Sequence, residues 1–233
     1  MGKQPIKFNI PLSTEQKEAK AAILTTDVNF LLGGEGSGKT MLSVNTALDL
    51  FFRKDTHYDK IIITRPAVAT EDFGYLPGDM NDKLGPYLAP IYETITDIYG
   101  NTDVKKNKIA RHFENNEIRI LPIAFTRGVT YSNAIVIVDE FQNCTQHQME
   151  MIIGRLGKSS KLIFAGSKVQ IDLPRKSSSA VHSVSKLETN EYTYIKELQS
   201  NHRHAAVVSI LDTLRKKEEQ YEERKDSEHK YVN

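Results

Sequence analysis

An eight-residue stretch, GGEGSGKT at residues 33–40, constrains the fold of this chain more than any other feature. It fits the pattern G-x-x-x-x-G-K-[ST], in which backbone N–H groups and the N-terminal end of the next helix surround a phosphate. The apolar run Val28–Leu32 precedes it, and a helical pattern continues to about Phe52. A strand, a glycine-rich loop and a helix in this order predict an α/β fold that holds a phosphate at the loop. A glycine-rich turn without a ligand is the alternative interpretation.

The residues of this loop are expected to divide the binding of a nucleoside triphosphate among them. Backbone N–H groups contact the β-phosphate, Lys39 reaches the β- and γ-phosphates, and Thr40 binds Mg²⁺. The residues expected to contact the nucleotide are Gly33, Gly34, Glu35, Gly36, Ser37, Gly38, Lys39 and Thr40. The expected cofactors are therefore ATP and Mg²⁺.

A second motif, AIVIVDEFQN at residues 134–143, ends a buried strand with two adjacent carboxylates. Open α/β folds bind ligands at the carboxyl ends of their strands, so Asp139 is expected to hold Mg²⁺ through water. Glu140 is expected to polarise the attacking water, which favours hydrolysis over transfer to a small acceptor. The alternative is that the acidic pair only caps a helix.

A third motif, LIFAGSKVQIDLP at residues 162–174, is another apolar strand that ends in a polar turn. In NTPases with a catalytic glutamate, this strand usually lies between the two strands that carry the phosphate site. Gln170 is therefore expected to sense the γ-phosphate. Ordinary turn chemistry at Gly166 and Ser167 is the alternative.

Apolar periodicity places further elements around these motifs. Strands are predicted at Ile61–Thr64, Ile118–Leu121 and Tyr192–Leu198, and helices at Thr14–Thr25, about Tyr87–Tyr99, Thr145–Leu156 and Arg203–Leu214. The pattern predicts an α/β P-loop NTPase with a RecA-like three-layer fold and a mostly parallel sheet. Residues 1–213 are expected to form one domain, and the charged tail, 214–233, is a solvated helix or disordered.

Composition limits the partners and the compartment. The 31 Lys and Arg residues nearly balance 30 Asp and Glu residues, so any nucleic acid would be bound by a local groove or an assembled surface. The one cysteine, Cys144, fits a reducing compartment and is expected to pack in the core. No apolar run reaches membrane-spanning length, no signal segment opens the chain, and Ile6 breaks a myristoylation motif. We expect a cytoplasmic protein with no membrane partner.

With these motifs in place, the chain resembles the PhoH-like P-loop ATPases, relatives of the nucleotide-binding core of superfamily-one helicases. The resemblance covers about Pro11–Leu211 and rests on five pieces in this order: GGEGSGKT, IIITRPAV, FGYLPGDMNDKLGPYLAPIYE, ILPIAFTRGVTYSNAIVIVDEFQN and QIDLP. It implies ATP hydrolysis and action on RNA as a helicase, sometimes with a nuclease activity. Single-stranded DNA is the alternative nucleic-acid partner.

Two positions depart from the family pattern. Ser167 stands where the family usually carries Asp after Gly, which is expected to weaken the Mg²⁺ or sensor network. Phe141 stands where alanine is commoner, which is tolerated if the ring packs beneath the following helix.

The resemblance also implies roles for four residues outside the phosphate loop. Gln16 would read the adenine edge, although Ser13 and Gln16 also fit a capping box at the start of a helix. Thr64 and Arg65 fall where related helicases contact the nucleic-acid backbone, and Arg65 could instead anchor the Pro-rich loop. Arg127 is similarly a candidate for a nucleic-acid contact or a structural cation.

Related helicases set the nucleotide between two such domains, and the second domain supplies an arginine to the transferring phosphoryl group. One such domain is predicted here, so we expect a neighbouring subunit of a closed ring, by resemblance a hexamer, to supply it. Arg175 and Arg203 are the candidates, with an arginine in cis or an ordinary surface cation as alternatives. A basic run is expected to be a solvated face or a phosphate-tracking patch; it consists of Lys105, Lys106, Lys108 and Arg111.

Three other functions stay open at this point. A small-molecule kinase would transfer phosphate to an acceptor. A nucleotide-gated oligomeric scaffold would bind ATP with little turnover, and an ATP-dependent ribonuclease would also cut RNA.

Overall fold

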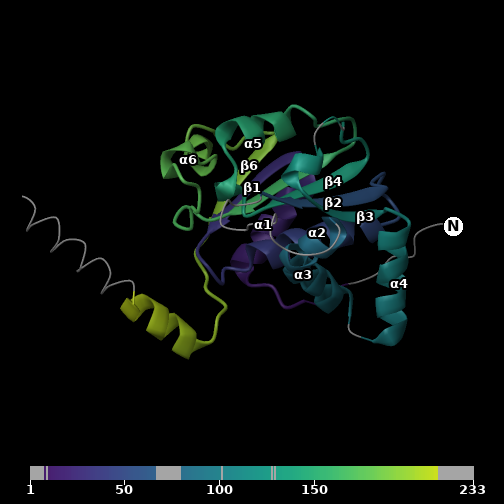
Figure 1. The fold of residues 1–233 in the computed structure, drawn as a ribbon, viewed down its shortest axis with the longest axis horizontal. Helices are drawn as coiled ribbons and strands as arrows, with labels where there is room; N and C mark the ends of the chain where they lie inside the picture. The colour runs from purple at the N-terminus through teal and green to yellow at the C-terminus, as the bar shows by residue number, and fades with distance from the viewer. Residues whose placement is uncertain are drawn as a thin grey trace, which may run out of the picture.

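In the part of the chain that the structure describes, six strands form one sheet, and every pairing between them is parallel (Figure 1). The computed structural model describes residues 8, 10–66, 80–100, 102–126, 128 and 130–214. The strands are β1 (Val28–Gly33), β2 (Lys60–Arg65), β3 (Ile118–Pro122), β4 (Ala134–Asp139), β5 (Lys161–Gly166) and β6 (Thr193–Leu198). Their order across the sheet is β3-β2-β4-β5-β1-β6. The predicted parallel sheet is confirmed.

The inner strands are buried along their length, which explains their continuous apolar runs. All six residues of β4 and all six of β5 are buried. Layers cover both faces of such a sheet, so most side chains that point either way are apolar. Successive side chains alternate between the faces: Ile61 and Ile63 join one core, and Ile62 joins the other.

Helices lie on both sides of the sheet and complete a three-layer sandwich (Figure 1). The helices are α1 (Thr14–Thr25), α2 (Lys39–Phe52), α3 (Met80–Tyr99), α4 (Asp103–Glu114), α5 (Gln146–Ile153) and α6 (Val181–Val184), with 3-10 turns η1 (Ile123–Thr126), η2 (Phe141–Asn143) and η3 (Lys176–Ser178). The first four helices contribute to the core that contains Ile61. Helices α5 and α6 contribute to the core that contains Ile62. This is the predicted RecA-like α/β architecture.

Helix α3 is longer than the sequence predicted. It begins at Met80 rather than at Tyr87 and runs through Gly85 and Pro86, two residues with low helix propensity. Later turns of the helix place Ile91 in the core, and such packing overrides local propensity. The basic run after it lies on α4, where Lys105, Lys106, Lys108 and Arg111 are exposed.

Helix α5 is shorter than predicted. It ends at Ile153 instead of Leu156, because the chain turns after Gly154. The carbonyl of Arg155 then accepts a hydrogen bond from the Tyr131 N–H at 2.9 Å. This bond ties the end of α5 to the segment before β4.

Phe141 and Cys144 occupy the core beneath α5. The Phe141 ring lies 5.9 Å from that of Phe30 and 5.6 Å from that of Phe164, between ring centroids. Cys144 is fully buried, and burial raises the pKa of its thiol to about 12. The predicted packing of both side chains is confirmed.

Residues 205–214 form a helix that extends away from the sheet (Figure 1). Its side chains Val207, Ile210 and Leu214 are 41%, 60% and 57% exposed. None of the described helices is long and apolar enough to cross a membrane. The predicted tail after Leu214 and most of the Pro- and Gly-rich segment lie outside the described residues.

Lys161, at the start of β5, is a buried cation that makes stability depend on pH. It is 2% exposed, and its ammonium group donates a hydrogen bond to the carbonyl of Thr26. Burial lowers the pKa of Lys161 from 10.5 to about 8, and the charge of Asp27 opposes the shift. At neutral pH the fold therefore holds a charge that water would solvate better.

The free energy of unfolding should rise between about pH 8 and pH 10.5, because the unfolded chain keeps this proton while the folded chain releases it. The shift corresponds to about 3 kcal/mol, at 1.36 kcal/mol per pKa unit. Urea unfolding at neutral pH and near the upper end of this range measures the rise in the free energy of unfolding. The rise should be absent in Lys161→Met. The control Lys158→Met removes an exposed lysine nearby and should keep it. An equal pH response of Lys161→Met and wild type would contradict the prediction.

Candidate nucleotide-binding site

The loop between β1 and α2 follows a backbone path that requires glycine at two positions. Gly36 and Gly38 have φ angles of 75° and 78°, in the left-handed region that other residues rarely adopt. A Cβ atom on Gly38 would lie 2.7 Å from Gln16 Nε2, and one on Gly36 would lie 2.5 Å from Asn201 Oδ1. The loop is therefore enclosed by α1 on one side and by the segment after β6 on another.

Lys39, the first residue of α2, folds its ammonium group into this loop. It donates hydrogen bonds to the carbonyls of Gly33 and Gly34, both at 2.9 Å, and to Ser37 Oγ at 3.3 Å. Burial lowers the pKa of Lys39, and the charge of Glu140 is the largest opposing effect. The loop thus holds a cation where the sequence places the β- and γ-phosphates.

Asp139, the last residue of β4, is 1% exposed and joins two other elements. Thr40 donates its hydroxyl proton to Asp139 Oδ1 at 2.7 Å, and Arg65 forms an ion pair with Asp139 Oδ2 at 2.7 Å. The fold therefore brings the two predicted Mg²⁺ ligands, Thr40 and Asp139, into direct contact. Arg65 anchors the end of β2 to this carboxylate.

Glu140 has an unusual backbone conformation beside this carboxylate. Its φ angle of 52° lies in the left-handed region, which costs about 1–3 kcal/mol for a residue other than glycine and is enriched at active sites. Burial raises the pKa of Glu140, the charge of Asp139 raises it further, and a hydrogen bond from Gln142 opposes the shift. The carboxylate is partly buried and is a stronger base than an exposed glutamate.

The oxygen atoms at this edge of the sheet fit Mg²⁺ that arrives with a nucleotide. Thr40 and Asp139 supply one hydroxyl and one carboxylate. In the described part of the chain no three His, Cys, Asp or Glu residues are grouped to hold a metal ion. Mg²⁺ commonly binds through one or two protein groups together with substrate phosphates and water. The residues present match that mode rather than a metal cage made of protein.

Strand β5 lies between β4 and β1, as predicted for an NTPase with a catalytic glutamate. The turn after it places Gln170 beside the phosphate loop, where its side-chain amide donates a hydrogen bond to Glu35 Oε1. Ser167, in the same turn, is 2% exposed, and its hydroxyl accepts a hydrogen bond from the Val169 N–H at 3.2 Å. The hydroxyl of Ser167 thus shapes the turn that carries Gln170.

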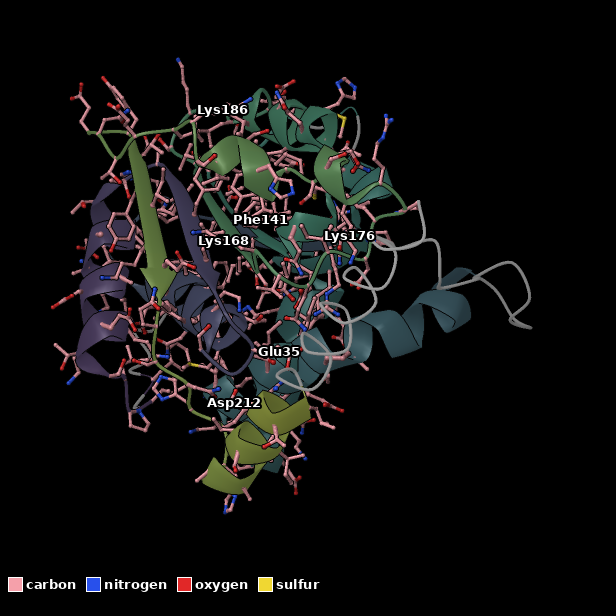
Figure 2. The ribbon with its side chains drawn as sticks, turned by 90° about the vertical axis from the view of Figure 1, so that its left-hand side faces the viewer. Glu35, Phe141, Lys168, Lys176, Lys186 and Asp212 are labelled. Atoms are coloured by element: carbon pink, nitrogen blue, oxygen red, sulfur yellow. The ribbon has the colours of Figure 1, made fainter. Side chains whose placement is uncertain are left out.

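Glu35 was expected only as a loop position, and the structure shows that it also joins two distant side chains. One oxygen accepts the hydrogen bond from Gln170, and the other forms an ion pair with Arg203, which follows β6. Figure 2 shows Glu35 at the end of the sheet toward which the β6 arrow points. The sequence did show that Glu35 places a carboxylate inside an anion-binding loop. Its partners lie so far along the chain that local patterns could not reveal them.

Gln16 forms the capping box and also contacts the phosphate loop. Its side-chain oxygen accepts from the Ser13 N–H at 3.1 Å, and its side-chain nitrogen donates to the Ser37 carbonyl at 3.1 Å. The side chain is 1% exposed. The capping-box interpretation is confirmed, and the buried amide also links α1 to the phosphate loop. A contact of Gln16 with the adenine edge stays a prediction.

Besides Arg203, four positions are candidates for a nucleic-acid contact or for the arginine at the phosphoryl group. Thr64 is fully buried, and its predicted contact with the nucleic-acid backbone stays a prediction. Arg65 pairs with Asp139, and Arg127 lies outside the described residues. Arg175 is exposed just before η3.

A family comparison agrees with this geometry. Residues 10–215 match the model of the family described as PhoH-like protein. The chain belongs to the PhoH-like protein family. The family match thus extends over both the phosphate loop and the acidic end of β4 of this PhoH-like chain.

The PhoH-like relatives are longer than this chain. It is 44% identical over 161 residues to a PhoH-like protein of Bacillus subtilis (strain 168), covering 69% of this chain and 48% of the relative. It is 39% identical over 155 residues to Protein PhoH of Escherichia coli (strain K12), covering 66% and 42%. It is 36% identical over 213 residues to a PhoH-like protein of Mycobacterium bovis, covering 90% and 58%. The chain therefore spans about half the length of these relatives.

Among solved structures, the Pif1 helicase from Candida albicans is similar at a TM-score of 0.46 and 19% identity, over 88% of this PhoH-like chain and 44% of the helicase. A Bacteroides Pif1 bound to ssDNA is similar at a TM-score of 0.42 and 13% identity, over 89% and 46%.

Proposed function

We propose that this PhoH-like chain binds ATP together with Mg²⁺ and hydrolyses the ATP. The observation that carries the proposal is the 2.7 Å hydrogen bond between Thr40 and Asp139, which sets the phosphate loop against the acidic end of β4. Lys39 directly precedes Thr40 in the chain, and Glu140 directly follows Asp139. Mg²⁺, when bound with the nucleotide, would neutralise charge on the β- and γ-phosphates.

The side chains at this contact have the properties that hydrolysis requires. Lys39 would exchange the loop carbonyls that now surround its ammonium group for phosphate oxygens. Glu140 would orient the attacking water and accept its proton, and its raised pKa suits that role. A water acceptor needs no further substrate pocket, which favours hydrolysis over a small-molecule kinase.

We propose single-stranded nucleic acid, RNA or DNA, as the partner that hydrolysis acts on, with remodelling by a helicase-like movement. The resemblance to helicase-related ATPases supports this extension. The Arg65–Asp139 ion pair supports it further, because it connects the end of β2, a predicted nucleic-acid contact, to a predicted metal ligand. Events at the nucleotide would therefore reach Arg65 directly.

Two substitutions separate nucleotide binding from hydrolysis. Lys39→Ala removes the cation at the phosphates and should weaken ATP binding and abolish turnover. Glu140→Gln keeps the shape of the side chain and should leave ATP binding intact while lowering turnover by about 100-fold, the scale of a positioned general base. Equilibrium binding of labelled ATP and release of free phosphate measure the two effects. Normal turnover by Glu140→Gln would remove Glu140 from the role of base.

The nucleic-acid partner is tested by salt. Binding of a fluorescent single-stranded RNA or DNA in the presence of ATP should weaken steeply as salt rises, with a log–log slope of about −0.7 for each neutralised phosphate. Phosphate release should increase when the preferred strand is added. If neither strand binds at low salt, and ATP binds with little turnover, the nucleotide-gated scaffold becomes the better account. Cleavage of the RNA would instead indicate a nuclease.

We also propose that the chain assembles into a ring, by family resemblance a hexamer, in which a neighbour supplies an arginine to the phosphoryl group. Exposed Arg175 is the better candidate for this role. Arg203 already contacts its own phosphate loop through Glu35, which favours action in cis. The two arginines therefore predict different behaviour in mixed assemblies.

Mixing inactive chains distinguishes the two arginines. Arg175→Ala mixed with Lys39→Ala should regain phosphate release, because some interfaces then pair an intact loop with an intact Arg175. Arg203→Ala mixed with Lys39→Ala should not, because Arg203 serves its own loop. Exchange of labelled subunits confirms that mixed assemblies form. Rescue by Arg203→Ala, or its absence for Arg175→Ala, would contradict the respective assignment.

A further inference from the structure

The phosphate loop carries a negative charge of its own. Glu35 lies among backbone N–H groups that suit an anion, and its side chain is 24% exposed. A nucleotide phosphate brought to the same loop would be repelled by this carboxylate. The contacts of Glu35 therefore bear on which nucleotide the loop accepts.

The carboxylate of Glu35 binds two side chains that come from opposite sides of the loop. Gln170 reaches Oε1 from the turn after β5, and Arg203 reaches Oε2 from the segment after β6. Both are among the residues that sequence reasoning assigns to the γ-phosphate. Glu35 is thus an anionic hydrogen-bond acceptor for both Gln170 and Arg203, the role that the γ-phosphate was expected to have.

The segment that carries Arg203 lies tightly over the loop. We call residues 199–203 the strap. The His202 N–H donates to the Gly36 carbonyl at 2.8 Å, and a Cβ atom on Gly36 would lie 2.6 Å from Arg203 Cγ. At its other end, the Gln199 N–H and the Ser200 hydroxyl donate to the Glu15 carboxylate at 2.9 and 3.0 Å. These ties hold the strap in place, so the guanidinium of Arg203 needs only a local movement to change its acceptor.

We propose that Glu35 determines specificity for triphosphates: its carboxylate holds Gln170 and Arg203 until a γ-phosphate displaces it from both. The proposal rests on the proposed function, because it requires a nucleotide in the loop. A γ-phosphate carries more negative charge than a carboxylate and more acceptor oxygens, so it competes well for a guanidinium. A diphosphate lacks that group and leaves the Glu35 contacts intact.

The test compares affinities for ATPγS and ADP, measured with Mg²⁺ by calorimetry on the full chain. Glu35→Gln removes the charge that competes with the γ-phosphate. It should raise the affinity for ATPγS relative to ADP by about tenfold, which corresponds to 1.4 kcal/mol, near the contribution of one hydrogen bond to a charged group. Glu35→Ala removes both acceptor oxygens and should give at least the same change. If Glu35 had only a structural role, the substitutions would change the affinities for ATPγS and ADP by the same factor.

A second substitution distinguishes release of Arg203 from simple repulsion of phosphate by Glu35. In an Arg203→Met background only Gln170 is left to release, so Glu35→Gln should raise the ratio of the two affinities by much less than it does when Arg203 is present. Direct repulsion would persist in that background. Glu197→Gln is the matched control, because it removes one exposed carboxylate that pairs with Lys168, near Gln170 but outside the loop. It should leave the ratio unchanged.

The outcomes separate the two proposals. If wild type binds neither ATPγS nor ADP, the proposed function and the role of Glu35 both fail. If both nucleotides bind and Glu35→Gln leaves their ratio unchanged or shifts it toward ADP, the role of Glu35 fails and the proposed function stands. A gain of undiminished size with Arg203→Met, or one that Glu197→Gln reproduces, also overturns the proposal.

Discussion

The site depends on one buried charge, the carboxylate of Asp139. A carboxylate that is 1% exposed is costly unless each oxygen is paired, and here Thr40 and Arg65 each bind one oxygen at 2.7 Å. Thr40 lies in the first turn of α2 and Arg65 ends β2, so neutralising this charge fixes the phosphate loop and the end of a neighbouring strand together. The contact between Thr40 and Asp139 joins residues 99 positions apart, and it exists because β5 alone separates β1 from β4.

The sheet around this charge was largely predictable, because parallel strands that are covered on both faces have unbroken apolar runs in their sequence. The predicted strands fall short mainly at their carboxyl ends. Arg65 and Asp139 belong to β2 and β4, yet both lie beyond the apolar run. The residues that apolar patterning leaves out at the strand ends are thus the ones that form the site. Thr64 shows the reverse case: it shares a face with Ile62, and the alternation along the strand would have indicated its burial.

What the sequence could not show is which polar side chains meet. Glu35 contacts Gln170 and Arg203 across 135 and 168 positions, and no local periodicity encodes such pairs. The sequence motifs predicted that each of the three residues contacts the nucleotide separately. In the structure the three side chains also form hydrogen bonds and an ion pair with one another. Polar residues gathered to bind a charged ligand need partners in its absence, and their mutual contacts become part of the energetics of binding.

The neighbours of β1 bear on how the chain folds during synthesis. Val28 in β1 pairs with Leu162 in β5 and with Thr193 in β6, so the strand before the phosphate loop has both partners far downstream. Distant parallel pairing is slow, because a long stretch of chain loses its freedom before any contact forms. The phosphate loop therefore leaves the ribosome early, and its supporting strand is completed late. On this topology, a nascent chain acquires its candidate nucleotide-binding site only when most of the domain has been made.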